Sequence, residues 1–169
     1  MLLPPFKGQE IKAFSKDKED ITLQLFAPNG FMKVDCDYSG KPYEQWESTD
    51  WPKTYQSPVY SNIFAVGIAF APPHFISKPM KSTKGTPISP TPPRTGMPSG
   101  IMGRTVAMSI AEMINKGATK PLYESPFAEM GVACVASAGA SLFNGSAASM
   151  TMCPVVPDFK KFPEHGRNL

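Results

Sequence analysis

Proline is the residue that most restricts how this chain can fold. The sequence holds 19 prolines among 169 residues, roughly twice the usual frequency. Proline has no backbone N–H and a fixed φ, so it interrupts helices and sheets and favours constrained, extended loops. Prolines are dense between Pro72 and Pro98, and so long a loop in a compact domain is usually functional. The composition therefore argues against a helical bundle.

Three segments before this loop have the hydrophobic patterns of strands. Residues 63–70 form a continuous apolar run, which predicts a strand covered on both faces, as in a parallel sheet. Residues 21–26 alternate apolar and polar side chains, which predicts a half-buried strand, and residues 31–34 are a further candidate. Residues 38–58 have no clear period and are expected to be a loop.

A helix is predicted over about 100–117, directly after the proline-rich loop 71–98. Ser99 is the expected N-cap and Gly117 the expected C-terminal stop. The apolar residues that recur at helical spacing are Val106, Ile110, Met113 and Ile114.

A β-hairpin is predicted in the last third of the chain. Met130–Val135 and Ser141–Phe143 are typical of short strands. Asn144-Gly145 favours a two-residue type I′ turn, and Ser146–Met152 is expected to return as the second strand. The residues after Met152 show no periodicity.

The net charge and the first residues of the chain indicate which partners and which cellular compartment to expect. The net charge of +3, from 17 basic and 14 acidic residues, is too small to indicate a nucleic-acid partner. No stretch reaches the 18 apolar residues of a membrane span. The first seven residues have neither the basic region nor the apolar region of a signal peptide. We therefore expect a cytoplasmic protein with reduced thiols.

The cysteines and histidines do not predict a metal site. Cys36, Cys134, Cys153, His74 and His165 are scattered singly, whereas zinc sites commonly use clustered ligands such as C-x-x-C pairs.

One arrangement suits a cofactor: a buried strand ending in Gly67, a long Pro/Gly loop, and then a helix whose start follows Arg94, Gly96 and Met97. A helix N-terminus has unpaired N–H groups that suit an anionic atom, and glycines let a ligand approach the backbone. Residues 98–105, which come directly after Met97, nearly match a P-loop. They lack its first Gly and its Lys, so nucleotide hydrolysis is not predicted. A plain strand–loop–helix connection remains the alternative.

Several segments resemble the carboxyl-terminal half of sulfide:quinone oxidoreductases, which are FAD-dependent relatives of the pyridine nucleotide–disulfide oxidoreductases. The most specific are Tyr60–Ala69, Gly85-Thr86-Pro87 and Pro93-Arg94-Thr95-Gly96. Residues 2–8, 127–131 and 154–158 resemble the family's exit from its central domain and its late segments. The resemblance covers nearly the whole chain.

The resemblance implies cofactor-binding roles. Gly67 and Ile68 would present amides to the ribityl–pyrophosphate part of FAD, and Gly96 and Met97 would face the pyrimidine side of the isoalloxazine. Arg94 stands where the family usually has Lys. Ile68 replaces the acidic residue of the wider superfamily, a change that the sulfide:quinone branch tolerates.

The resemblance also implies a residue of the quinone pocket, and it bears on which cysteine could be the redox thiol. Phe127 occupies the position of an aromatic residue that lines the quinone pocket. Better-known members have a cysteine immediately before it, but this chain has Pro126. Cys134 is the candidate replacement, and a small buried strand residue is the equally weighted alternative.

The chain is expected to be a portion of such a flavoprotein, either cut or encoded separately. No G-x-G-x-x-G motif occurs, so the first dinucleotide-binding unit is missing. The family's membrane-docking segments would begin near Leu169. The expected fold is α+β, partly α/β. Residues 1–120 would be a remnant of a three-layer FAD/NAD-binding domain, and residues 121–169 a hairpin region with an irregular tail.

The expected function is the FAD-contacting and quinone-side part of an enzyme that passes electrons from sulfide through FAD to a quinone. The chain alone is expected to be inactive and to bind FAD weakly. Its expected partner is the missing flavoprotein portion or a second copy, because the predicted strand 63–70 would lack cover. The alternative is a non-catalytic interaction domain that retains the scaffold, and flanking coding sequence would discriminate the two.

Overall fold

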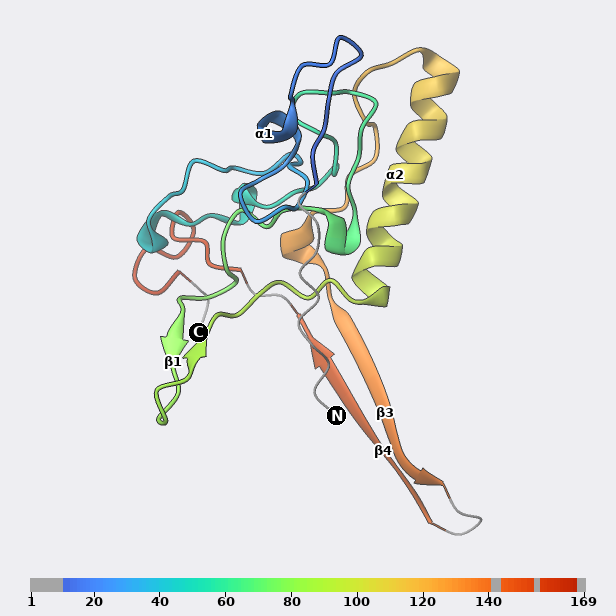
Figure 1. The fold of residues 1–169 in the computed structure, drawn as a ribbon. Coiled ribbons are helices and arrows are strands. Elements are labelled where there is room, and N and C mark those ends of the chain that lie inside the picture. The colour runs from blue at the N-terminus through green and yellow to red at the C-terminus, as the bar shows by residue number, and fades with distance from the viewer. Residues whose placement is uncertain (1–10, 141–143, 154–155, 167–169) are drawn as a thin grey trace.

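The computed structural model describes residues 11–140, 144–153 and 156–166. The fold is α+β, as predicted: one long helix, two small antiparallel sheets and long connecting loops with short helical turns (Figure 1). Both sheets in this part of the chain have two strands, so the described residues contain no layered parallel sheet of the kind found in an FAD-binding domain.

The core is built mainly from loop residues far apart in sequence. Val34, Tyr55, Phe70, Met102 and Phe127 are fully buried and belong to one cluster. The Phe70 and Phe127 rings meet edge to face at 5.8 Å, a favourable arrangement for aromatic rings. The Tyr55 hydroxyl donates a hydrogen bond to a backbone carbonyl 70 residues away. Side-chain packing, more than strand pairing, therefore holds the loops together.

The long helix α2 spans Gly96–Lys116. Gly117 ends it in the left-handed conformation, with φ 62°, as predicted. The predicted start is wrong: Thr95 is the N-cap, and Ser99 lies inside the first turn. The buried residues of α2 are Pro98, Met102, Thr105, Val106 and Ser109.

The predicted strand 63–70 does not form. The segment makes isolated bridges at Phe64 and Phe70, and a short 3-10 helix, η3 (Gly67–Ala69), interrupts it. Gly67 has a φ of 59°, which breaks the extended conformation, and Ile68 is 71% exposed. The apolar run correctly marked a core segment at Ala65 and Phe70, but hydrophobicity alone does not supply a neighbouring strand.

The two earlier strand predictions are also wrong. Residues 22–25 form a short helix, α1 (Thr22–Leu25), and the Asp20 carboxylate accepts a hydrogen bond from the Thr22 amide at its start. Within 31–34, Met32 makes only isolated bridges, with Phe26 and Phe70. In 38–58 the structure has two 3-10 turns, η1 (Tyr43–Gln45) and η2 (Ser48–Asp50), in an otherwise irregular segment.

The proline-rich loop contains one small hairpin. Strands β1 (Met80–Lys81) and β2 (Pro87–Ile88) pair antiparallel, and Gly85 lies in the turn with a φ of 79°. The rest of the segment up to Thr95 has no helix or strand.

The predicted carboxyl-terminal hairpin forms, but its predicted two-residue Asn144-Gly145 turn is wrong, because Gly145 is the first residue of the second strand and pairs with Ala140. After a 3-10 turn, η4 (Phe127–Glu129), strand β3 (Val132–Ala140) pairs antiparallel with β4 (Gly145–Met152). The hairpin projects away from the body of the molecule (Figure 1). The predicted strand Ser141–Phe143 lies outside the described residues. No helix in the described ranges is both long and apolar enough to span a membrane.

Candidate functional site

The η3 turn packs against the start of α2, and Gly67 makes this contact possible. Its amide lies 3.2 Å from the Met102 Sδ, to which it donates. A Cβ built on Gly67 would lie 2.7 Å from the Ser99 Oγ, closer than real Cβ contacts. Its φ of 59° also disfavours any residue with a side chain. Position 67 therefore requires glycine for two independent reasons.

The first turn of α2 offers backbone amides to a ligand. The Thr95 side chain makes no capping hydrogen bond, and Pro98 has no N–H, so the turn's amide donors include those of Gly96 and Met97. A Cβ built on Gly96 would meet nothing within 4 Å, and Met97 is half exposed. The sequence-predicted residues Gly67, Ile68, Gly96 and Met97 thus lie on two segments that the fold brings together.

Arg94 links these two segments. Its Nη1 donates to the Ile68 carbonyl at 3.2 Å and to the Phe70 carbonyl at 3.0 Å. Its guanidinium lies over the Phe31 ring, 4.7 Å from the centroid, a favourable cation–π distance. Partial burial lowers the pKa of Arg94 because it disfavours the charged form. Through its hydrogen bonds to these two carbonyls, the Arg94 guanidinium holds the η3 segment in place.

A pocket of about 300 Å³ is lined in part by this arginine. Its lining combines Phe31 and Arg94 with prolines of the long loop. Its full lining is Asn29, Phe31, Pro72, Pro73, His74, Phe75, Thr91, Pro92 and Arg94.

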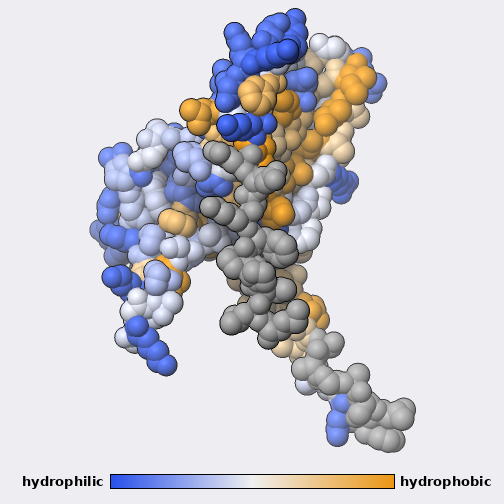
Figure 2. Space-filling view, viewed as in Figure 1, coloured by the Kyte–Doolittle hydropathy of each residue, from blue (hydrophilic) through white to orange (hydrophobic). Residues whose placement is uncertain are grey.

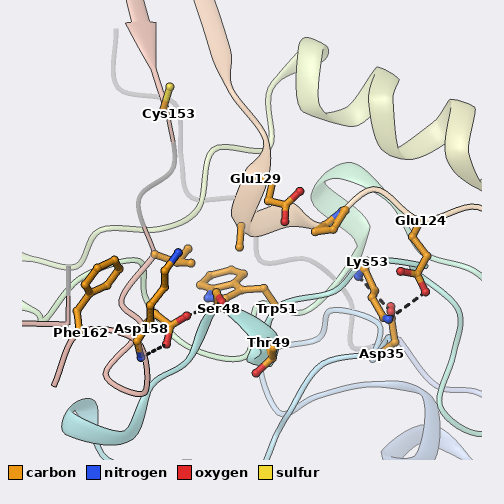
Figure 3. A pocket seen from close by; sticks show the side chains of 14 residues that line it. Asp35, Ser48, Thr49, Trp51, Lys53, Glu124, Glu129, Cys153, Asp158 and Phe162 are labelled. Carbon is orange, nitrogen blue, oxygen red and sulfur yellow. Dashed lines mark hydrogen bonds and ion pairs between the residues drawn. The ribbon is translucent and has the colours of Figure 1, made fainter. Parts of the chain in front are cut away.

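A larger cleft, of about 790 Å³, lies beside Phe127. Figure 3 shows the Trp51 indole in the middle of its side chains, with Ser48 and Asp158 to one side and Lys53 and Glu124 to the other. The Trp51 Nε1 is buried and has no hydrogen-bond partner, which is unusual for a buried donor.

Phe127 itself does not line this cleft. It is fully buried and stacks on Trp51, with ring centroids 5.0 Å apart. Its neighbours Pro126, Ala128 and Glu129 form the wall instead. The structure thus gives Phe127 a place in the core and not in the wall of this cleft.

The three cysteines occupy separate environments. Cys134 is exposed on β3 opposite Met150, and Cys153 is exposed and lines the larger cleft. In the hairpin register, Cys153 follows the Val132–Met152 pair, so it falls on the opposite face from Cys134. Cys36 is partly buried, and burial raises the pKa of its thiol well above the usual range.

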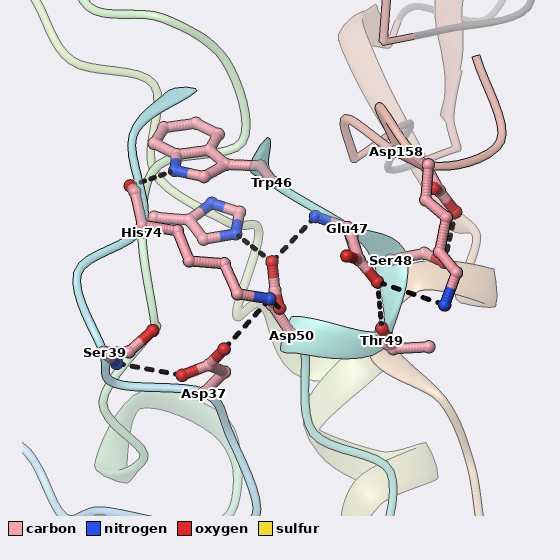
Figure 4. A network of polar contacts seen from close by, with 11 residues as sticks. Asp37, Ser39, Trp46, Glu47, Ser48, Thr49, Asp50, His74 and Asp158 are labelled. Carbon is pink, nitrogen blue, oxygen red and sulfur yellow. Dashed lines mark hydrogen bonds and ion pairs between the residues drawn. The ribbon is translucent and has the colours of Figure 1, made fainter. Parts of the chain in front are cut away.

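A buried polar network lies next to the larger cleft (Figure 4). The Asp50 carboxylate is 2% exposed and accepts hydrogen bonds from the Lys41 Nζ at 2.5 Å and the Glu47 amide at 2.7 Å. The His74 ring stacks on Trp46 at 3.9 Å, and its Nε2 is 3.7 Å from Asp50 Oδ2, too long for a hydrogen bond. Burial lowers the pKa of His74 because it disfavours the imidazolium.

Sequence reasoning missed this network and the Trp51 cleft. Asp50 and Lys41 occur in an aperiodic polar segment, where charges are normally solvated. His74 follows two prolines in a loop, so nothing in its spacing connects it with Asp50. The two tryptophans were the one available signal, because large aromatic residues in a polar loop usually find a core to pack against.

The described residues contain no group of three or more His, Cys, Asp or Glu side chains placed to hold a metal ion. Comparison with protein-family models, with curated proteins and with solved structures found no match.

Proposed function

We propose that this chain is the FAD-contacting and quinone-side portion of a sulfide:quinone oxidoreductase-like flavoprotein. The observation that carries the proposal is the packing of the Gly67–Ala69 turn against the start of α2. These two segments are the ones whose motifs resemble the family, and they are separated in sequence by the proline-rich loop. On this proposal, residues 1–120 are a remnant of a three-layer domain whose parallel sheet another segment would supply.

The residues present fit a flavin in their chemistry. Gly67 and Ile68 would present the η3 backbone to the ribityl–pyrophosphate part, and the amides of Gly96 and Met97 would donate to the pyrimidine oxygens. The amides would stabilise negative charge at that position. Arg94 would act as a positioning residue, since its guanidinium holds the carbonyls of the η3 segment.

The larger cleft would serve the quinone side. A quinone is flat, and the lining of the cleft that would hold it includes the Trp51 indole. The Phe127 ring, which stacks on Trp51, would hold the indole in place. When bound, FAD supplies the two-electron chemistry that joins oxidation of sulfide to reduction of a quinone to its quinol. Cys134 is the proposed thiol of the relay, and its exposure on β3 leaves the sulfur accessible.

Flavin titration followed by amide NMR tests the proposal. We expect FAD and riboflavin to shift the amide signals of residues 66–69 and 95–97, whereas adenosine, which has neither the flavin nor the pyrophosphate, leaves them unchanged. The expected affinity is weak, with a Kd above about 100 μM, because the G-x-G-x-x-G loop that grips the pyrophosphate does not occur in this sequence.

Two glycine variants sharpen the test. Gly96→Val puts a branched side chain where a Cβ has open space, so we expect the fold to persist and flavin binding to weaken at least tenfold. Gly131→Val is the matched control, because a Cβ there also meets nothing within 4 Å. If flavin shifts neither the η3 turn nor the α2 start, the proposal is wrong.

The alternative, a non-catalytic interaction domain, is favoured by the exposed hydrophobic residues on α2 and the hairpin. Such a domain would show none of the localised flavin shifts.

A further inference from the structure

The pocket of about 300 Å³ that Arg94 lines has an unbalanced charge. Arg94 is the one permanently charged residue among the described residues of its lining, and no acidic residue shares that lining. The larger cleft, in contrast, is lined by four acidic residues and two lysines. The smaller pocket therefore favours an anion over a neutral or cationic ligand.

Arg94 uses only part of its hydrogen-bonding capacity. A guanidinium has five N–H donors, and the printed hydrogen bonds of Arg94 are the two from Nη1 to the Ile68 and Phe70 carbonyls. Within the part of the chain that the structure describes, Nε and Nη2 donate to no acceptor, and no carboxylate pairs with this residue. Nε and Nη2 share one edge of the planar group, and this fork matches the two oxygens of a carboxylate.

The acidic residue next to the pocket is already paired. The Asp50 Oδ2 lies 3.7 Å from the Nε2 of His74, which lines the pocket, but Asp50 also forms an ion pair with the Lys41 Nζ. Burial lowers the pKa of His74, so this ring is neutral at pH 7. Arg94 is therefore a partly buried cation without a counter-charge, and such a charge is stabilised by an anionic partner.

The remaining walls of the pocket are largely apolar. The Arg94 guanidinium lies 4.7 Å from the centroid of the Phe31 ring, so the cation and an aromatic wall are adjacent. The volume is at the lower end of the range for ligand pockets, so the ligand is small. A flat apolar ring with one carboxylate meets these requirements. The apolar lining residues are Phe31, Pro72, Pro73, Phe75 and Pro92.

A hydrophobic surface alone would not identify a ligand. Figure 2 shows hydrophobic residues gathered along α2 on the side in view, and a surface of this kind specifies no particular partner. The pocket is more specific, because it combines a cavity, an unpaired cation and aromatic walls.

We propose that this pocket binds a small aromatic monocarboxylate. The carboxylate accepts hydrogen bonds from the Nε and Nη2 of Arg94, and the ring packs against the phenylalanine and proline side chains. Inorganic phosphate has no apolar body to fill such walls. Because Nη1 keeps its bonds to the η3 segment, the inference is independent of the proposed flavin chemistry.

Titration with 2-naphthoate at pH 7, followed by NMR, tests the proposal. We expect the Arg94 Nε–H signal to shift, together with the backbone amides of Phe31, His74, Phe75 and Thr91. The expected Kd is roughly 0.1–3 mM for so small a ligand. Two probes separate the contributions: 2-naphthamide has the ring without the charge, and acetate has the carboxylate without the ring. Each should bind at least tenfold more weakly.

Two variants at Thr91 isolate the role of charge. Thr91 is exposed and belongs to the pocket lining, so its substitution should leave the fold intact. Thr91→Glu supplies a carboxylate that competes for Arg94. Thr91→Gln is the matched control, because it has nearly the same shape without the charge. Binding of 2-naphthoate should be at least tenfold weaker in Thr91→Glu than in Thr91→Gln.

A second pair of variants tests the aromatic wall. Phe75 is 37% exposed, and Phe75→Ala should weaken 2-naphthoate binding at least fivefold. Phe14 is 58% exposed and outside the lining of this pocket, so Phe14→Ala should change the Kd less than twofold. Equal binding of 2-naphthamide, equal affinities of the two Thr91 variants, shifts confined to the larger cleft, or no binding at about 20 mM would each overturn the proposal.

Discussion

Gly67 connects the sequence motif to the candidate flavin site at the scale of a single residue. Its left-handed backbone turns the chain after Val66, and the missing side chain leaves room for Ser99 of α2. The same glycine could be singled out from sequence because it lies in the segment that resembles the flavoprotein family. Its backbone conformation could not, because an apolar run around a glycine is equally compatible with an extended strand.

Substitution of Gly67 should destabilise the fold far more than substitution of another glycine in the same conformation. Gly67→Ala combines backbone strain with a contact of 2.7 Å to the Ser99 Oγ, and we expect a loss of about 2–4 kcal/mol in the free energy of unfolding. Gly85→Ala has a φ of 79° but open space around the Cβ, and should cost about 1 kcal/mol. Urea denaturation measures both.

A second substitution identifies the cause. Ser99→Ala removes the hydroxyl that a Cβ on residue 67 would meet. In the Gly67→Ala background it should recover part of the lost stability, although alone it should be neutral or slightly destabilising. Equal losses for Gly67→Ala and Gly85→Ala would show that the close approach to α2 does not constrain position 67.

At the scale of elements, helix α2 and the β3–β4 hairpin could be predicted from sequence, while the segments before them could not. The helix has a clear period and a glycine stop, and the second hairpin strand begins at Gly145, beside the predicted turn, so local signals place both elements approximately. Residues 63–70 have a strong strand pattern, yet a strand also needs a neighbour with free backbone groups, and this requirement is not encoded locally. Phe127 was expected to line a pocket but is buried, because whether an aromatic ring faces a cleft or the core depends on distant residues such as Trp51.

The network around Asp50 joins the 3-10 turn η2 to the loop that starts after Phe70, and it should make stability depend on pH. Burial lowers the pKa of His74 below its ordinary 6.5. As the pH falls below this value, the unfolded chain binds a proton that the folded chain does not. The free energy of unfolding should therefore decrease between pH 7 and pH 5. Above pH 7 both states are neutral at this residue, and its contribution should be constant.

Denaturation of two histidine variants across this range would isolate the effect. His74→Phe keeps a flat ring against Trp46 but cannot bind a proton, so its stability should be less dependent on pH. His165→Phe makes the same change at an exposed position and should retain the wild-type slope. A wild-type slope in His74→Phe would mean that another group causes the loss.

At the scale of the whole molecule, the body and the hairpin differ in how they are stabilised. The body is a set of loops closed over an aromatic core, whereas each residue of β4 is exposed and β3 pairs mainly with β4. Val132 is the exception, because it is 2% exposed at the base of the hairpin. A two-stranded hairpin in water is marginally stable by itself, so the body should not depend on its outer part.

Removing the outer hairpin should therefore leave the body folded. In a chain with residues 134–150 replaced by Asn-Gly, the pair Ala133–Thr151 is closed by a two-residue turn. We expect the free energy of unfolding to change by less than about 1 kcal/mol, with the near-ultraviolet circular dichroism of Trp51 and Phe127 retained. Val132→Ala in the full-length chain is the contrasting variant. It removes buried methyl groups from the hairpin base and should cost about 1–3 kcal/mol. If the shortened chain unfolds, the outer hairpin contributes to the core in a way that its exposed residues do not reveal.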